Sequence, residues 1–379
     1  MSRFMRILTT IFFVLTFTCA ASFAADTIKI GVQAPTTGKY ANEGQGIDNG
    51  VRLIAEQVNA DGGILGKKIE VFTCDDEGTA MKAAICAKDL VNKEVLAVIG
   101  SYTSTCAEAA QSTYYRAGVL QTSDGTADSL TEHGYWTFFR NSFPNSAEGT
   151  YTADYFVNVK QYEKIAIVSD FSSFANGLAN TVEKEIEKLG GNIVFRGKIK
   201  AGNQNYTPVL TRIKSKNPDV IYFSGYYPEA GLLRAQQAKL GIQADFVGGN
   251  ACDNPDFIEL AGDAVEGAYL INVPTPSMLP YDLAVNFLED YRAKYNEDPP
   301  SIWTLLNIDG MRAILHAMEE TGTTDTKKVA EYLHNDLTDF PGITGPINFA
   351  ENGDRIGSAH QTYEIQADGS YKIVYPKAD

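Results

Sequence analysis

The chain has 379 residues, of which 44% are hydrophobic, and its formal net charge is −15 at pH 7. This length is too great for one ordinary hydrophobic core, so two domains are expected. The negative charge excludes nucleic acid as an expected partner, because the protein and a phosphate backbone would repel each other.

The first 24 residues have the layout of a secretory signal peptide. Arg3 and Arg6 precede a mostly apolar run from Ile7 to Phe17, and Ser22–Ala24 places small residues at the −3 and −1 positions of a cleavage site. The apolar run is shorter than the roughly 20 residues that a membrane span needs. We therefore expect a signal peptide over residues 1–24 and a mature chain that folds outside the cytoplasm.

Strand and helix patterns then alternate, with short links between them. Short apolar runs between turn residues predict the strands Thr27–Gln33, Lys68–Thr73, Val95–Gly100 and Val119–Thr122. Apolar residues at helical spacing predict the helices Glu43–Asn59, Ala80–Asn92 and Ser104–Ala117. Strands and helices in this order form right-handed βαβ units, so this run predicts a parallel sheet.

The same rhythm begins again near residue 164 and predicts a second parallel sheet. Its expected strands are Lys164–Asp170, Asn192–Ile199, Val220–Ser224 and Asp245–Gly248. Its expected helices are Phe174–Leu189, Thr207–Ser215, Pro228–Leu240 and a short one after Asn254 and Pro255, a capping residue followed by a first-turn proline. The expected fold class is therefore α/β, with two doubly wound lobes.

Three helical patterns follow the second run without new parallel strands. They are Tyr281–Tyr295, Ile302–Glu320 and Asp325–Leu333, and the chain ends in a predicted hairpin around Asp368-Gly369. These late helices are expected to return to the first lobe, so that the chain crosses between lobes several times and forms a hinge. We expect residues 26–145 and 274–350 in lobe 1, and residues 146–273 and 351–379 in lobe 2.

Cleavage of the signal peptide would remove one cysteine, Cys19, and leave four. A lipoprotein anchor at Cys19 is an alternative, which Thr16 disfavours because a lipobox has Leu or a similar residue there. An oxidising compartment favours disulfides, and a local bridge is expected among the first three of the remaining cysteines, although four buried free thiols are the alternative. The remaining cysteines are Cys74, Cys86, Cys106 and Cys252.

Motifs of metal sites and of common enzymes are missing from the sequence. There is no CxxC, and the four histidines lack ligand spacing, so neither a metal nor another cofactor is expected. No GxSxG, P-loop or HExxH motif occurs. Gly44, Gly46 and Gly50 come near a dinucleotide fingerprint, but the third glycine is one place late. Glu43 and Asp124 form a carboxylate pair of unknown separation, and we do not expect an enzyme.

Polar and aromatic residues follow the strands at the edge where ligands bind to parallel sheets. Ser101–Thr105 joins a strand to a helix start, whose hydroxyl and N–H groups can bind an anion, although helix capping is the alternative role. The next strand leads into Thr122–Thr126, and the second sheet places Tyr226 and Tyr227 at the corresponding edge. A cleft with a polar and an aromatic wall is expected, unless the two tyrosines serve only packing.

Over essentially the whole mature chain, the sequence resembles the periplasmic type I solute-binding proteins of ABC transporters, specifically the branched-chain amino-acid (Leu/Ile/Val) binding group. The segments that carry the resemblance are IKIGVQAPTTGKYANEGQG, NADGGILGKKIEVFTCDDEG, LAVIGSYTS, KIAIVSD, PDVIYFSGYYPEAG and FVGGN. The resemblance implies two lobes joined by three hinge strands, a location in the periplasm and closure over a small molecule. It also implies a membrane permease as partner, although a sensory ligand-binding module is an alternative.

The resemblance also implies a set of ligand-binding residues. Ser104 and Thr126 would bind the carboxylate of the solute, and Phe174 and Tyr226 would surround its side chain. The full expected set is Glu43, Tyr102, Ser104, Thr105, Asp124, Gly125, Thr126, Phe174, Tyr226 and Asn250.

Two of these positions depart from the family pattern. Asn250 stands where the family has an acid for the solute's ammonium group, and Glu43 stands where many members have an aromatic residue. A buried ammonium group without a carboxylate partner is costly. Either Asp124, Glu43 or Asp253 supplies the missing charge, or the solute has no α-amine and is an aromatic acid, a keto acid or an amide. A hydrophobic amino acid is the favoured solute.

Overall fold

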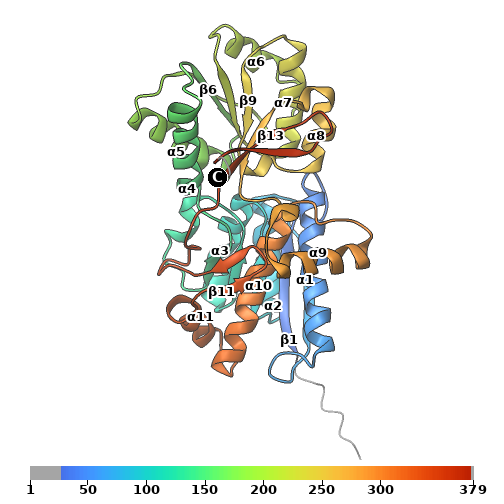
Figure 1. The fold of residues 1–379 in the computed structure, drawn as a ribbon. Coiled ribbons are helices and arrows are strands. Elements are labelled where there is room, and N and C mark those ends of the chain that lie inside the picture. The colour runs from blue at the N-terminus through green and yellow to red at the C-terminus, as the bar shows by residue number, and fades with distance from the viewer. Residues whose placement is uncertain (1–26, 377–379) are drawn as a thin grey trace, which may run out of the picture.

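The computed structural model describes residues 27–376, so the expected signal peptide lies outside the described residues. Two lobes lie end to end, and each is built on one sheet with helices on both faces (Figure 1). This arrangement confirms the expected fold class. Across residues 27–376 we find no helix with the length and apolar character of a membrane span.

The sheet of the first lobe has five parallel strands in the order β2-β1-β3-β4-β5. The strands are β1 (Ile28–Ala34), β2 (Ile69–Asp75), β3 (Ala97–Gly100), β4 (Leu120–Ser123) and β5 (Phe138–Arg140). The helices between them are α1 (Ala41–Ala60), α2 (Ala80–Asn92) and α3 (Ser104–Ala117). The sequence predicts all of these elements except β5, which has only three residues.

The sheet of the second lobe has seven strands in the order β14-β13-β10-β9-β8-β6-β7. The parallel strands are β6 (Ile165–Ser169), β7 (Ile193–Lys198), β8 (Val220–Ser224), β9 (Asp245–Gly248) and β10 (Tyr269–Asn272). The antiparallel hairpin β13 (Gln361–Ile365) and β14 (Tyr371–Tyr375) extends the sheet through β10 and confirms the predicted hairpin.

Five α-helices of the second lobe fall among the described residues. They are α4 (Asn145–Asp154), α5 (Ser173–Lys188), α6 (Thr207–Lys214), α7 (Tyr227–Lys239) and α8 (Pro255–Ala261). The sequence does not predict α4, because its residues NSAEGTYTAD have no clear apolar stripe, and it does not predict β10.

The late helices pack on the first lobe. They are α9 (Asp282–Tyr295), α10 (Ile302–Thr321) and α11 (Thr326–Asn335), followed by the short strands β11 (Phe340–Gly342) and β12 (Gly345–Ile347). Helix α10 packs against α1, β3 and β4. A Cβ atom on Gly46 would lie 2.6 Å from Pro300 Cδ, and one on Gly50 would lie 2.4 Å from Ile308 Cδ1. These glycines of α1 therefore allow close packing against α10 and its N-terminal loop.

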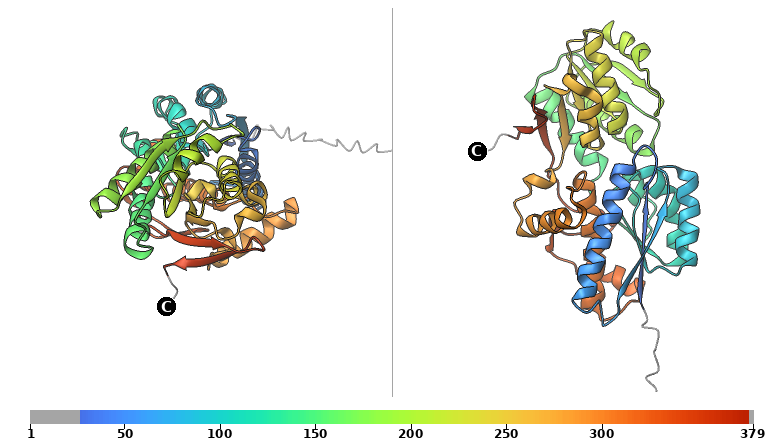
Figure 2. Two further views of the ribbon diagram at one scale, coloured as in Figure 1. Left: turned by 90° about the horizontal axis from the view of Figure 1, so that it is seen from above. Right: turned by 90° about the vertical axis from the view of Figure 1, so that its right-hand side faces the viewer.

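The chain passes between the lobes three times, through residues 141–144, 273–281 and 348–360. The late helices (orange) lie in the first lobe, whereas the C-terminal hairpin (dark red) lies in the second (Figure 1 and Figure 2). The third passage runs beside β5, where the Arg140 amide donates to the Gly353 carbonyl at 2.8 Å. Three connections between two lobes can act together as a hinge.

One disulfide joins Cys74 at the end of β2 to Cys86 of α2, which confirms the expected local bridge. Cys106 and Cys252 are free thiols and are buried. The alternative of four free thiols is therefore wrong.

Candidate functional site

A cavity between the lobes brings together most of the expected binding residues. Its empty volume is about 210 Å³ when the space open to solvent is included, but only about 10 Å³ of it admits the centre of a water molecule. That is room for about one water molecule. The lining residues are Tyr102, Ser104, Asp124, Gly125, Thr126, Phe174, Tyr226, Asn250, Ala251 and Trp303.

In the first lobe, the cavity wall begins at the N-terminus of α3. Thr103 caps this helix by accepting a hydrogen bond from the Cys106 amide. The next residue, Ser104, accepts a hydrogen bond from the Ala127 amide at 3.2 Å, which links the helix to the loop after β4. A hydroxyl that accepts one bond still has its own hydrogen to donate. Together with the positive end of the helix, this hydroxyl has the chemistry to bind an anion.

A buried arginine holds the loop after β4. Arg140 donates to the carbonyls of Gly125 and Ala127 at 2.8 and 2.9 Å, and to the Asp354 carboxylate at 2.6 Å. Ser142 donates to the Asp124 carbonyl at 2.7 Å. The backbone carbonyls of the loop are thus bound on one side, while the residues Asp124, Gly125 and Thr126 line the cavity on the other.

Aromatic rings run across the cavity from one lobe to the other. Phe174 lies in the first turn of α5, and Tyr226 immediately precedes α7; their ring centroids are 5.2 Å apart. The Tyr226 ring is 5.8 Å from that of Tyr102 in the first lobe, which is 6.4 Å from that of Trp303. The tyrosine at position 226 therefore faces the cavity as well as packing against its neighbours.

The sequence did not identify Trp303 or Ala251. Trp303 lies in the first turn of α10, a helix rich in apolar residues and mostly buried, so its sequence suggests a core helix. Ser104 and Phe174 also lie in the first turns of their helices. The position of Trp303 in the first turn of a helix is therefore the sequence signal that could have identified it as a binding residue.

Two of the expected residues, Thr105 and Glu43, do not line the cavity. Thr105 accepts a hydrogen bond from the Ser173 amide at 3.2 Å and lies on an open cleft outside the cavity, which Tyr226 also lines. Glu43 is buried, and its carboxylate accepts hydrogen bonds from Asn254 at 2.6 Å and Ser301 at 2.7 Å. Tyr226 therefore separates the cavity from the open cleft, and Glu43 connects α1 to α8 and to the start of α10.

Several buried polar atoms at the cavity have no hydrogen-bond partner among the described residues. They are both carboxyl oxygens of Asp124, the hydroxyls of Tyr102 and Tyr226, Asn250 Oδ1 and Trp303 Nε1. Burial and the nearby Glu43 raise the pKa of Asp124 well above its ordinary value. Burial also raises the pKa of Glu43 to about 7, although its hydrogen bonds oppose this shift. Buried polar groups normally have partners, so these atoms are available to a bound solute.

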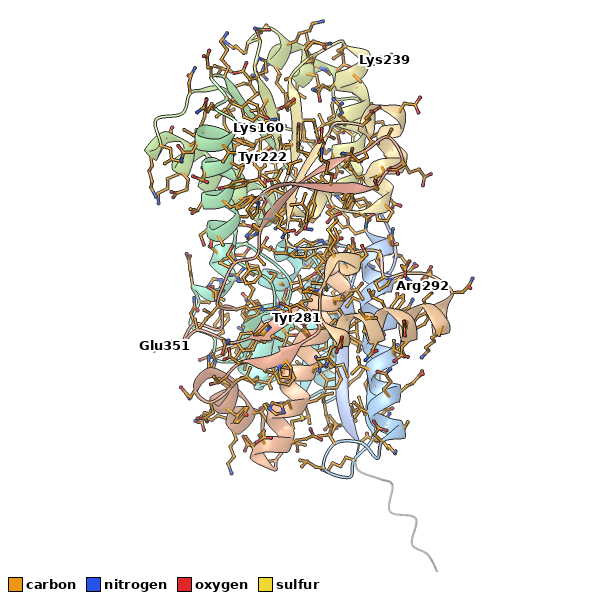
Figure 3. All side chains as sticks on the ribbon, viewed as in Figure 1. Lys160, Tyr222, Lys239, Tyr281, Arg292 and Glu351 are labelled. Atoms are coloured by element: carbon orange, nitrogen blue, oxygen red, sulfur yellow. A yellow bond between two sulfur atoms is a disulfide. The ribbon has the colours of Figure 1, made fainter. Side chains whose placement is uncertain are left out.

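A third buried carboxyl group supports the cavity wall in the second lobe. Glu148 of α4 accepts hydrogen bonds from the Asn250 amide at 3.1 Å and from the Tyr222 hydroxyl at 3.4 Å. Tyr222 lies within the second lobe (Figure 3). Burial raises the pKa of Glu148 to about 8. Glu148 therefore holds the backbone of Asn250 in place without contacting the cavity itself.

Comparison with known proteins identifies relatives over nearly the whole described chain. The family model described as periplasmic binding protein matches residues 27–370. A leucine-, isoleucine-, valine-, threonine-, and alanine-binding protein from Pseudomonas aeruginosa is 31% identical over 351 residues, which are 92% of each chain. A leucine-specific-binding protein from Salmonella typhimurium is 28% identical over 92% of this chain and 94% of its own length.

Solved structures have the same fold. The structure of a leucine-binding protein from Thermotoga maritima superposes with a TM-score of 0.85 at 28% identity, over 92% of this chain and 97% of that one. The branched-chain amino acid transporter substrate-binding protein from Streptococcus pneumoniae, in complex with isoleucine, has a TM-score of 0.82 at 30% identity, over 92% of this chain and all of that one.

Proposed function

Because the chain belongs to the periplasmic binding protein family, we propose that it is the extracytoplasmic receptor of an ABC importer and captures a small carboxylate-bearing solute by closing its two lobes. The favoured solute is an amino acid of the branched-chain or hydrophobic type. The names of the relatives from Pseudomonas and Streptococcus support this class. The solute is bound and released unchanged, and the closed form is recognised by a membrane permease.

The observation that carries this proposal is a cavity whose walls come from both lobes. Ser104 and Thr126 lie on the first lobe, and Phe174 and Tyr226 lie on the second. A solute that contacts both walls stabilises the closed state relative to the open one. In this proposal the solute's carboxylate binds at the start of α3, and its side chain packs against the rings.

The small size of the cavity supports a closing mechanism. Its free space admits about one water molecule, which is much less than an amino acid occupies. A solute can therefore enter only if the lobes separate or the lining rings move. The hinge described above permits such a separation.

A ligand screen tests the proposal. We expect leucine, isoleucine, valine, threonine or alanine to raise the melting temperature of the protein in a concentration-dependent manner. Ser104→Ala should weaken binding about 10-fold or more, which corresponds to the loss of one hydrogen bond to a charged group. Ser112→Ala, on the same helix but away from the cavity, should bind like the wild type. The receptor proposal fails if neither amino acids nor organic acids stabilise the protein.

The rings around the cavity favour an aromatic acid as a second candidate solute. Tyr102, Phe174, Tyr226 and Trp303 would enclose a planar ring as well as an aliphatic chain. Titration with benzoate beside leucine distinguishes the two classes, because only the preferred solute should saturate the site at low concentration.

A further inference from the structure

The cavity contains a buried acid that no residue of the described chain neutralises. The Asp124 side chain is 2% exposed, and neither of its carboxyl oxygens has a hydrogen-bond partner among residues 27–376. The nearby Asn307 amide opposes the rise in the pKa of Asp124, and its hydrogen bond within 3.5 Å goes to the Trp303 carbonyl at 3.0 Å. An unpartnered buried carboxyl group costs stability, whether it is ionised or neutral. Its position at the cavity therefore points to a partner that arrives with the solute.

The two other acids that could receive a cation are already occupied. Glu43 accepts hydrogen bonds from Asn254 and Ser301, and it does not line the cavity. Asp253 accepts hydrogen bonds from Asn272 at 2.9 Å and Tyr371 at 2.8 Å, and it also lies off the cavity. Of the three acids, Asp124 alone has free oxygens at the cavity surface.

The remaining lining of the cavity also suits a positive charge. It contains no lysine, arginine or histidine, so an anion placed beside the Asp124 carboxyl group would have no cation to balance it, whereas a cation would stabilise the ionised form of Asp124. Asn250 Oδ1, from the other lobe, is a further free acceptor. The rings of Tyr102, Tyr226 and Trp303 can stabilise a cation by cation–π attraction.

We propose that Asp124 binds the ammonium group of the solute, so that the acid for this group lies on the first lobe and the second lobe contributes only the neutral Asn250. This inference rests on the proposed receptor function. The solute's carboxylate then lies towards Ser104 and Thr126, and its ammonium group lies between Asp124 and Asn250. The receptor selects amine-bearing solutes and rejects keto acids and simple aromatic acids.

Calorimetry with matched ligands tests the inference. The probes are each standard amino acid that stabilises the wild type, the keto acid of the same carbon skeleton, and benzoate. We expect the amino acid to bind and its keto acid to bind at least about 100-fold more weakly, as for a buried charge pair that loses one partner. Asp124→Asn should weaken binding of the amino acid to a similar degree. Asp128→Asn is the matched control, because Asp128 accepts hydrogen bonds from Ser146 outside the cavity.

A double variant separates loss of the charge from damage to the loop. Asp124→Asn combined with Asn250→Asp places the acid on the second lobe. This double variant should bind the amino acid at least about tenfold more tightly than Asp124→Asn alone. The melting temperature of ligand-free Asp124→Asn should equal or exceed that of the wild type, because the variant removes an unpartnered buried carboxyl group.

Three outcomes overturn the inference. A keto acid or benzoate that binds the wild type as tightly as any amino acid, or an Asp124→Asn variant that keeps its affinity for the amino acid, would leave the receptor function intact but remove the ammonium site. If no amino acid and no organic acid binds the wild type, the receptor function itself fails and the ammonium site fails with it.

Discussion

Asn254, the N-cap of α8, donates a hydrogen bond to Glu43 of α1 at 2.6 Å, and this bond joins the second lobe to the first. Ser301, the N-cap of α10, donates to the other oxygen of the same carboxylate at 2.7 Å. Because Trp303 follows in the first turn of α10, Glu43 links the second lobe to one wall of the cavity.

We expect Glu43→Ala to favour the open state and to weaken solute binding about tenfold, as for the loss of one buried hydrogen bond between the lobes. Small-angle scattering of the ligand-free variant should give a larger radius of gyration than that of the wild type. Glu43→Gln keeps an acceptor oxygen and should have a smaller effect, and Glu132→Ala, at an exposed position in the first lobe, should have none. Equal affinities for all of these proteins would refute the role of Glu43 in closure.

Arg140 is expected to be essential for both stability and binding. Arg140→Met removes the guanidinium group from two carbonyls and from Asp354, which should cost about 3 kcal/mol of unfolding free energy in chemical denaturation. It should also weaken binding, because the carbonyls belong to the loop that carries Asp124. Arg292→Met is the control: Arg292 lies on the outer surface (Figure 3), its ion pair with Asp298 is solvent-exposed, and its loss should cost less than about 1 kcal/mol.

Glu148 should make the ligand-free protein less stable as the pH rises. The pKa of Glu148 is about 8 in the folded protein and lower in the unfolded chain, so between about pH 5 and 8 the unfolded chain binds fewer protons. The unfolding free energy should then fall by up to about 1.4 kcal/mol per pH unit from this group. Denaturation at pH 5, 6, 7 and 8 should give a shallower slope for Glu148→Gln, which keeps an acceptor for Asn250. Glu259→Gln, at an exposed position of α8, should keep the wild-type slope, and identical slopes for all three proteins would mean that Glu148 ionises freely when buried.

The disulfide should stabilise the first lobe. Its loop is short, and the double substitution of Cys74 and Cys86 by Ser should lower the unfolding free energy by about 3 kcal/mol on the chain-entropy account. Burial raises the pKa of Cys106 and of Cys252, so neither thiol should react with an alkylating reagent in the native protein. Mass spectrometry after alkylation should find both thiols labelled only in unfolded protein; native labelling would contradict their burial.

Trp303 should report solute binding by fluorescence. It lines the cavity, whereas the second tryptophan of the chain, Trp136, lies off the cavity in the first lobe. A saturating solute should change the emission of the wild type and of Trp136→Phe to a similar extent. Trp303→Phe should lose this signal, and a signal that survives in Trp303→Phe would place the solute elsewhere.

The sequence predicts the parts of the fold that strong local patterns specify. A short continuous apolar run between turn residues, as in β3, is typical of a strand buried on both faces, and capping residues such as Thr79, Thr103 and Asn254 indicate helix starts. Strand β5 pairs with β4 over three residues, too few for a pattern, and α4 is rich in polar residues that the structure buries, including Glu148. Tertiary packing, which no local pattern encodes, decides these elements.

The candidate site was likewise predictable where local patterns place a residue, and not where distant contacts do. Residues directly after strands or at helix starts, such as Ser104, Asp124 and Tyr226, meet at one cavity because parallel strands all end at the same edge. Glu43 could not be placed from its position alone, because its partners Asn254 and Ser301 lie more than two hundred residues away in the chain. The sequence left three acids open as the source of the missing charge, and only the hydrogen bonds of the folded structure distinguish among them.

The position of Tyr226 between the cavity and the open cleft has a kinetic consequence. Tyr226 lines both spaces, so a solute that passes between them would have to displace this ring, which would slow capture and release alike. A smaller residue there would speed up both directions together. In the proposed receptor, the residence time of the solute, and with it the interval in which a permease can meet the loaded protein, would then depend on the size of this one ring.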